Sequence, residues 1–325
     1  MSDLLEIRDL HVLFSIWGQK VHALRGINFS LRKGEVLGIA GESGCGKSVA
    51  AKAIMRLLPM HCSTIPQGGV LYEGRDLLQV SEDEMQRIRG KQIGMIFQDP
   101  MTSLNPTQTI GAQVMEGYRL HHPETSEREA KLYTIDLLRQ VGIPQPDERM
   151  LAYPHMFSGG LRQRAMIALA ISSQPQILLA DEPTTALDVT IQAQILDLLR
   201  KIAQERGMSI ILITHDLSVI ASMCDRVVIM YAGKIVEEAS VDELFATPRH
   251  PYTRGLLHSI PRLDTPRDHP LVPIEGRPPN LTKPITGCAF CPRCSSALRI
   301  CTTQDPPAIL SSHDHRVACW QEVKT

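Results

Sequence analysis

The sequence has few of the features by which proteins bind nucleic acid. Aromatic residues occupy only 4% of its 325 positions, and the net charge is −1 because 34 basic residues face 35 acidic ones. Nucleic-acid binding generally needs a basic surface, often with aromatic side chains on which bases stack. We therefore expect no nucleic-acid partner.

The sequence also lacks a long apolar run. A membrane-spanning helix needs roughly 20 apolar residues, whereas the longest runs here, 210–213 and 227–231, have the length of buried strands. The first residues show no cationic stretch leading into an apolar one, so we expect no signal peptide. Thiols should then stay reduced, which matters because five of the eight cysteines lie in the last 38 positions.

Short apolar runs separated by helical stretches predict a mostly parallel α/β sheet. The runs lie at 36–40, 93–97, 177–180, 210–214 and 227–231. A glycine-rich turn follows the first run, and after it a helix is predicted at 48–58, where Pro59 stops it. Alternating apolar and polar residues at 4–14, 21–31 and 70–72 predict an antiparallel β layer beside the main sheet.

Helical patterns replace strands between about 100 and 174, where Ser126 and Glu129 have the spacing of a capping box. From Pro248 onward prolines multiply and hydrophobic periodicity is lost. This change predicts an extended, loop-rich tail whose cysteines compensate for a thin core. We therefore predict an α/β domain over residues 1–246, with its helical subdomain at about 100–174, and a tail domain over residues 247–325.

A complete phosphate-loop pattern follows the first predicted strand of the main sheet. Its residues are Gly41, Glu42, Ser43, Gly44, Cys45, Gly46, Lys47 and Ser48, with Val49 next. Glycines let the backbone amides turn inward around phosphates, Lys47 adds a positive charge, and Ser48 offers a hydroxyl to Mg²⁺. The position between a strand and a helix makes a coincidental glycine turn a poor explanation.

Two further motifs complete the chemistry. Asp181 and Glu182 end the apolar run that starts at Ile177, so Asp181 is placed to reach the water shell of Mg²⁺ and Glu182 to polarise an attacking water. Such a pair alone is usually a solvated loop start. Upstream, the segment Ser158-Gly159-Gly160 opens a helix with bare amides, which is a second anion-binding geometry. Two phosphate grips in one domain indicate a nucleotide clamped between two chains.

With these motifs in this order, residues 4–245 resemble the nucleotide-binding subunit of an ABC transporter. The resemblance implies an ABC-type P-loop NTPase fold that uses ATP and Mg²⁺. It implies that Gln98 senses Mg²⁺, that Asp188 lies in a loop crossing the dimer interface, and that His215 contacts the terminal phosphate. Read without the resemblance, Gln98 is a surface residue, Asp188 is an N-cap and His215 is structural.

The resemblance also implies an aromatic residue stacked on adenine. Phe14 is the first candidate and Trp17 the second, and either could instead be a core residue. Two positions depart from the family pattern. Phe157 stands where Leu is usual and is expected to pack similarly, while Val49 lacks the hydroxyl that often follows Ser48 and leaves the α-phosphate to backbone amides.

Segments outside the core resemble the ATPases of bacterial dipeptide and oligopeptide importers. They are 98–106, 188–194, 249–253 and 287–294. The resemblance implies a second, non-identical ATPase subunit, two membrane-spanning permease subunits and an external peptide-binding protein, with this chain peripheral on the cytoplasmic face of the inner membrane. The alternatives are a related nickel or glutathione importer, a soluble non-transport ABC ATPase acting on ribosomes or DNA, and a metal-sensing regulator dominated by the tail.

The tail cysteines form a Cys-x-x-Cys-x-x-Cys pattern with later cysteines, which is typical of iron–sulfur ligation. A zinc site that also uses His313 or His315, and a set of unliganded thiols, are the alternatives. The resemblance implies that four cysteines hold a [4Fe–4S] cluster, with Cys291 as an extra candidate ligand. The four are Cys288, Cys294, Cys301 and Cys319.

Overall fold

The computed structural model describes residues 3–185, 187–259, 273–312 and 314–323. The chain divides into two compact units. The first unit comprises residues 1–32, 36–78 and 214–325, and the second comprises residues 33–35 and 79–213. Among the described residues, every helix is too short or too polar to cross a membrane.

An antiparallel sheet forms the N-terminal part of the first unit, as predicted. Strands β1 (Leu5–Ile16) and β2 (Gln19–Leu31) form a long hairpin, and β5 (Gly69–Tyr72) pairs with the other edge of β1. Two short strands, β4 (Ser63–Thr64) and β6 (Arg75–Asp76), extend it. Trp17 and Gly18 both have positive φ, which suits a two-residue hairpin turn.

The second sheet of this unit carries the phosphate loop. Strand β3 (Val36–Ala40) is buried throughout and runs parallel to β10 (Arg226–Tyr231), which is antiparallel to β11 (Lys234–Ser240). Helix α1 (Lys47–Ile54) follows the loop. It ends earlier than predicted, because Arg56 adopts a left-handed conformation before Pro59 is reached.

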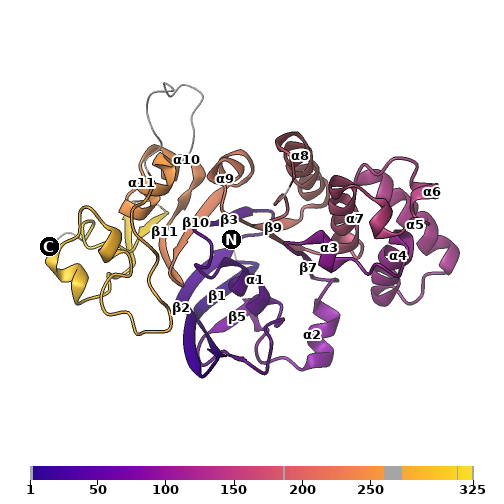
Figure 1. The fold of residues 1–325 in the computed structure, drawn as a ribbon. Helices are drawn as coiled ribbons and strands as arrows, with labels where there is room; N and C mark the ends of the chain where they lie inside the picture. The colour runs from indigo at the N-terminus through magenta and orange to yellow at the C-terminus, as the bar shows by residue number, and fades with distance from the viewer. Residues whose placement is uncertain (1–2, 186, 260–272, 313, 324–325) are drawn as a thin grey trace. The chain divides into compact units, whose positions relative to one another are not determined.

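Helices α9 (Leu217–Met223) and α10 (Val241–Ala246) accompany this sheet, and α10 packs on β10 and β11 (Figure 1). Their apolar side chains share one core cluster with Tyr231 and Phe290. The C-terminal residues therefore contribute to the core of the first unit.

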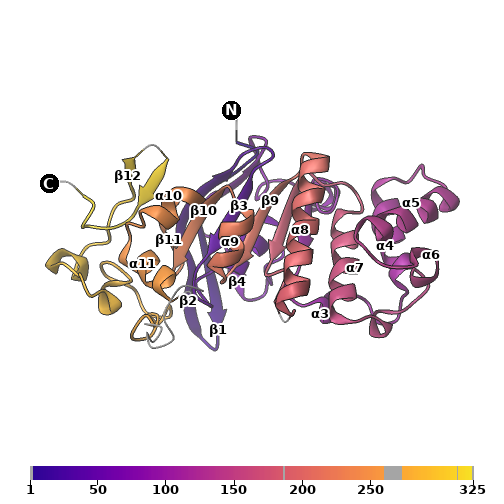
Figure 2. The same cartoon turned by 90° about the horizontal axis from the view of Figure 1, so that it is seen from above.

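The tail has more regular structure than the sequence predicted. Helix α11 (Pro251–His258) begins with a proline at N1, where a missing N–H costs nothing. The hairpin β12 (Ile309–Ser312) and β13 (His315–Val317) extends the sheet, since β13 pairs with β11 and β12 lies at the edge (Figure 2). Two 3₁₀ turns, Cys291–Arg293 and Arg299–Thr302, lie between them. The prediction of a tail without periodic structure was therefore wrong for these segments.

The second unit is built on three parallel strands. They are β7 (Ile93–Ile96), β8 (Ile177–Asp181) and β9 (Ser209–Thr214), all buried along their length. Helix α7 (Gly159–Ile171) packs against β7, and α8 (Val189–Arg206) connects β8 to β9. These strands match the apolar runs that predicted a parallel sheet.

Helices occupy the rest of the second unit. They are α2 (Glu82–Ile88), α3 (Pro100–Ser103), α4 (Ile110–His121), α5 (Glu127–Gln140) and α6 (Pro146–Arg149), with a 3₁₀ turn at Pro154–Met156. The predicted capping box of α5 is confirmed, because Ser126 accepts from the Glu129 amide while the Glu129 carboxylate accepts from the Ser126 amide. Helix α7 also contacts α3, α4 and α5, so it is the helix around which this group assembles.

Candidate nucleotide site

The phosphate loop lies between β3 and α1 in the first unit. Gly41, Gly44 and Gly46 all have positive φ, which turns the amides between them into one concave surface. A Cβ atom on Gly41 would lie 2.2 Å from the Met230 carbonyl oxygen, so only glycine fits there. The loop geometry is therefore the one that phosphate binding by backbone amides requires.

Lys47 is held inside this loop. Its side chain is buried, and Nζ donates to the carbonyl oxygens of Gly41 at 2.7 Å and Glu42 at 3.1 Å. A buried ammonium needs such acceptors. The charge is thus fixed beside the amides that would receive a phosphate. Ser48 and Val49, both half-buried, follow in the first turn of α1.

The tail also contacts the loop, which the sequence did not predict. The Tyr252 hydroxyl accepts a hydrogen bond from the Glu42 N–H at 2.8 Å. Tyr252 is fully buried against Tyr231 and Phe290, and this burial raises the pKa of its phenol. The segment 249–253 resembled a family pattern, but nothing in its spacing indicated a contact more than two hundred positions away.

The acidic motif lies at the end of β8 in the second unit. Asp181 is buried, and the Glu182 carboxylate accepts hydrogen bonds from side chains of the same unit. Gln98 Nε2 donates to Glu182 Oε2 at 3.0 Å, and Thr185 Oγ1 donates to the same oxygen at 2.9 Å. Two of the predicted site residues, Gln98 and Glu182, are therefore in direct contact although 84 positions separate them.

Glu182 also has an unusual backbone. Its φ is 48°, in the left-handed region that non-glycine residues seldom adopt. Its N–H donates to the Ile213 carbonyl at 2.9 Å, which fixes the bend directly after the strand. Strained residues of this kind are concentrated at functional sites. The conformation turns the carboxylate away from the strand direction and toward Gln98.

The Ser-Gly-Gly segment begins α7 as predicted. The Ser158 hydroxyl accepts from the Leu161 N–H at 3.4 Å, and a Cβ on Gly160 would lie 3.0 Å from Ile191. Gly159 and Gly160 therefore leave the amides of the first turn uncovered by side chains. Phe157 is buried, which agrees with the packing expected of a residue that replaces Leu.

Asp188 caps α8, because its carboxylate accepts from the Ile191 N–H at 2.9 Å. The expected N-cap role is thus confirmed, and the expected role at a dimer interface stays a prediction. His215 follows β9 and is exposed. Phe14 is half-buried in β1, while Trp17 is 97% exposed in the hairpin turn, so the alternative that Trp17 belongs to the core is wrong.

The five tail cysteines are free thiols. Burial raises the pKa of Cys288 to about 11, and the neighbouring Cys301 and Cys319 act in the same direction. The Cys288 N–H donates to the Cys301 carbonyl oxygen at 2.8 Å, and the Cys294 N–H donates to the Cys291 carbonyl oxygen at 3.2 Å. These bonds bring the backbone of Cys288 next to that of Cys301, 13 positions later in the chain.

The structure contains no preformed metal site among the described residues. Within those ranges, no group of three His, Cys, Asp or Glu side chains is placed to hold a metal ion, whether zinc or the iron of a cluster. His315 is committed elsewhere, since Nε2 bonds Glu237 at 2.7 Å and Nδ1 lies 3.1 Å from Glu243. The expectation that His315 could ligate zinc was therefore wrong, and His313 lies outside the described residues.

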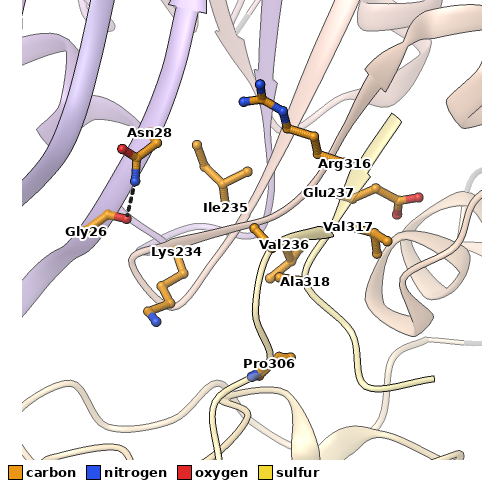
Figure 3. A pocket seen from close by; sticks show the side chains of 11 residues that line it. Gly26, Asn28, Lys234, Ile235, Val236, Glu237, Pro306, Arg316, Val317 and Ala318 are labelled. Atoms are coloured by element: carbon orange, nitrogen blue, oxygen red, sulfur yellow. Dashed lines mark hydrogen bonds between the residues drawn. The ribbon is translucent and has the colours of Figure 1, made fainter. Parts of the chain in front are cut away.

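A small cavity of about 160 Å³ lies between β2, β11 and the tail hairpin (Figure 3). Val236, Val317 and Ala318 give it apolar walls, and Lys234 and Arg316 are among its charged lining residues. The Glu237 carboxylate points away from it. The cavity contains none of the predicted nucleotide-site residues, so it is separate from the phosphate loop.

Two family models match the chain. One is described as "ABC transporter" and matches residues 24–185, and the other, "Oligopeptide/dipeptide transporter, C-terminal region", matches residues 236–301. The second match covers the segment that joins β11 to the first four tail cysteines. Both the nucleotide core and the tail thus have counterparts in transporters.

Curated relatives match over nearly the whole chain. The oligopeptide transport ATP-binding protein OppD of Bacillus subtilis is 53% identical over 98% of this chain and 89% of its own length. The dipeptide transport ATP-binding protein DppD of Lactococcus lactis is 48% identical over 97% and 90%. Among solved structures, a dimeric ATP-binding cassette bound to ADP and Pi is similar with a TM-score of 0.66 and 26% identity, over 73% of this chain and 98% of that one.

Proposed function

Because the chain belongs to the family of ATP-binding subunits of oligopeptide and dipeptide ABC importers, we propose how its residues divide the work. It is the ATPase motor of a peptide importer and uses ATP and Mg²⁺. The observation that carries the catalytic assignment is the Glu182 carboxylate, held by Gln98 and Thr185 at a strained bend. A carboxylate fixed in this way can accept a proton from water.

The first unit would bind the phosphates of ATP. The amides of residues 41–49 and the Lys47 ammonium supply positive potential, and the exposed His215 would donate to the γ-phosphate. Phe14 would stack on adenine. Ser48, Gln98 and Asp181 would hold Mg²⁺, which offsets charge that develops on the phosphate oxygens.

The second unit would supply the base. As a water oxygen bonds to the γ-phosphorus, Glu182 takes a proton from that water and the bond from phosphorus to the ADP oxygen breaks. Gln98 and Thr185 both donate to Oε2 of Glu182 and so keep this oxygen in place. The products are ADP and inorganic phosphate.

The family functions through paired ATPases that act on membrane permeases, and this chain associates peripherally with the membrane. We propose that the sister ATPase is non-identical and that Ser158, Gly159, Gly160 and Asp188 close over its nucleotide. We further propose an external peptide-binding protein, a cytoplasmic location, and contact with the permeases through residues 98–106, where Met101 is 60% exposed. Residues 1–246 would form the nucleotide-binding domain and residues 247–325 the tail.

We propose that Cys288, Cys294, Cys301 and Cys319 hold a [4Fe–4S] cluster. The proposal is supported by the spacing of the cysteines, by their free thiols and by the backbone hydrogen bond between Cys288 and Cys301. Cys291 is a further candidate ligand. Iron and acid-labile sulfide analysis of anaerobically purified protein should give equal amounts of the two elements, and the presence of neither would contradict the cluster.

Co-purification tests the transporter assignment. The tagged full-length chain, extracted from its native membrane in mild detergent, should bring down two permease chains and a second ATPase. Mass spectrometry identifies the associated chains. Recovery without any permease would overturn the assignment and favour a soluble ABC ATPase, whereas permeases of a nickel or glutathione importer would correct only the cargo.

A further inference from the structure

The tail reaches the phosphate loop through a second residue, Arg293. It lies between Cys291 and Cys294, and its guanidinium forms a two-pronged ion pair with Glu42, the second residue of the loop. Nη1 lies 2.7 Å from Glu42 Oε2, and Nη2 lies 2.9 Å from Oε1. The two residues are 251 positions apart, and the Arg293 side chain is only 4% exposed.

The position of the guanidinium is fixed by the tail itself. Nε donates to the Glu275 carbonyl at 2.9 Å and Nη2 to the Ile274 carbonyl at 3.1 Å. The group also lies near the rings of Tyr231 and Phe290, 5.8 and 5.9 Å from their centroids. Arg293 is therefore held by contacts other than the one with Glu42.

Glu42 in turn holds the parts of the loop that contact phosphate. Its carbonyl oxygen accepts from Lys47 Nζ at 3.1 Å and from the Cys45 N–H at 3.3 Å. Its N–H donates to Tyr252. A shift of the Glu42 side chain would therefore displace a carbonyl that positions the Lys47 ammonium.

We infer that Arg293 is a positioning residue for the phosphate loop, and that the Arg293–Glu42 pair makes ATP affinity depend on the order of the cysteine-bearing segment. The inference rests on the proposed function, because it concerns the same nucleotide site. Charge-assisted bonds with two parallel contacts are the strongest and most directional that side chains form. A segment outside the matched nucleotide core would thus set the geometry of its phosphate grip.

Equilibrium binding of MgATP to the purified full-length chain tests the inference, with the steady-state hydrolysis rate measured on the same samples. Arg293→Met keeps the length of the stem and removes the charge. It should raise the Kd for MgATP about tenfold, as expected for losing a charged hydrogen-bonded pair, while kcat at saturating ATP stays within about twofold. The Kd of Arg293→Lys should lie between those of the wild type and Arg293→Met, because an ammonium keeps the charge but cannot make both parallel bonds.

Two further variants separate positioning from general damage. Arg299→Met removes an exposed arginine from the same tail and should leave the Kd at the wild-type value. The pair Glu42→Gln and Arg293→Met, combined, should weaken binding no more than either change alone, because both break one interaction. Losses of MgATP affinity that add up in the double variant would show that the two residues act independently, which would contradict the inference.

A cysteine variant tests whether the cysteine-bearing segment acts on the phosphate loop through Arg293. Cys294→Ser should raise the Kd in the wild-type background and have little effect when Arg293 is already Met. If Arg293→Met binds MgATP as Arg299→Met does, the inference is overturned although the ATPase assignment stands. If the wild-type chain itself neither binds nor hydrolyses MgATP, the proposed function fails. Should Arg293→Met not fold, an unchanged Kd in Arg293→Lys and Glu42→Gln would overturn the inference equally.

Discussion

Two loops of this protein invite comparison, the one after β3 and the one after β8. Each follows a buried strand and contains a glutamate held by side chains from elsewhere. Glu42 faces the guanidinium of Arg293, whereas Glu182 receives an amide from Gln98 and a hydroxyl from Thr185. Glu42 is thereby tied to a distant segment of the tail, whereas Glu182 lies at a strained bend directly after its strand. The place of each carboxylate in its loop thus distinguishes the positioning glutamate from the reacting one.

The largest expected effect comes from the reacting glutamate. Glu182→Gln keeps the shape of the side chain and removes the group that accepts a proton. We expect kcat for ATP hydrolysis to fall about 10²- to 10⁴-fold, the usual contribution of a general base, with the Kd for MgATP within about twofold of wild type.

Glu42→Gln provides the matched comparison. It makes the same chemical change in the other loop and should weaken binding while hydrolysis at saturating ATP persists. A Glu182→Gln variant that hydrolyses ATP near the wild-type rate would remove the distinction between the two glutamates. Phosphate release and equilibrium nucleotide binding measure the two quantities separately.

The sequence predicts those parts of the site that depend on residues close together in the chain. The phosphate loop, the parallel strands and the caps at Ser126 and Asp188 involve residues a few positions apart, so spacing and backbone chemistry determine them. Even the Glu182 position follows from the strand that precedes it. Its contact with Gln98 could be expected only from the family resemblance, because the two residues are 84 positions apart.

Long-range contacts of the tail could not be predicted in this way. Strand β11 was missed because Glu237 and Glu238 interrupt its apolar pattern, although both are buried. Glu238 pairs with Arg226 on β10, and Glu237 accepts from the amides of Arg249 and His250. Polar residues can replace apolar ones in a core only when distant partners satisfy them, and a single sequence does not show those partners.

A pH series tests how the first loop is held. His250 caps α11 next to Tyr252, and its Nδ1 accepts the Tyr252 N–H at 3.0 Å, which requires a neutral ring. Burial lowers the pKa of His250 from 6.5 to about 4, with Arg254 adding to the effect and Glu237 opposing it. The folded pKa is below the unfolded one, so this stabilisation is complete above pH 6.5 and is lost as pH falls through about 4.

We expect the wild-type free energy of unfolding to fall by up to about 3 kcal/mol from this group between those limits. In His250→Asn, the new side chain can still cap α11 but does not titrate in this pH range. This variant should lose less of its free energy of unfolding, as measured by urea unfolding at several pH values. His315 does not obscure the comparison, because both proteins contain it. Burial acts to lower its pKa, and the hydrogen bonds that its ring donates to the Glu237 and Glu243 carboxylates raise it overall. Equal losses in both proteins would assign the acid sensitivity to other groups.

Tyr252→Phe should have the smallest effect and is the finest test of the comparison. The ring would stay in its aromatic cluster with Tyr231 and Phe290, and only the acceptor for the Glu42 N–H would be lost. One neutral hydrogen bond contributes about 1 kcal/mol, so the Kd for MgATP should rise roughly fivefold. Tyr72→Phe, a matched change of a buried tyrosine on β5, should leave that Kd unchanged. Because Tyr252 holds the backbone of Glu42 and Arg293 holds its carboxylate, a loss of affinity with Tyr252→Phe as large as that with Arg293→Met would mean that the backbone bond and the ion pair contribute equally to the position of the loop. A smaller loss would place most of the control in the ion pair.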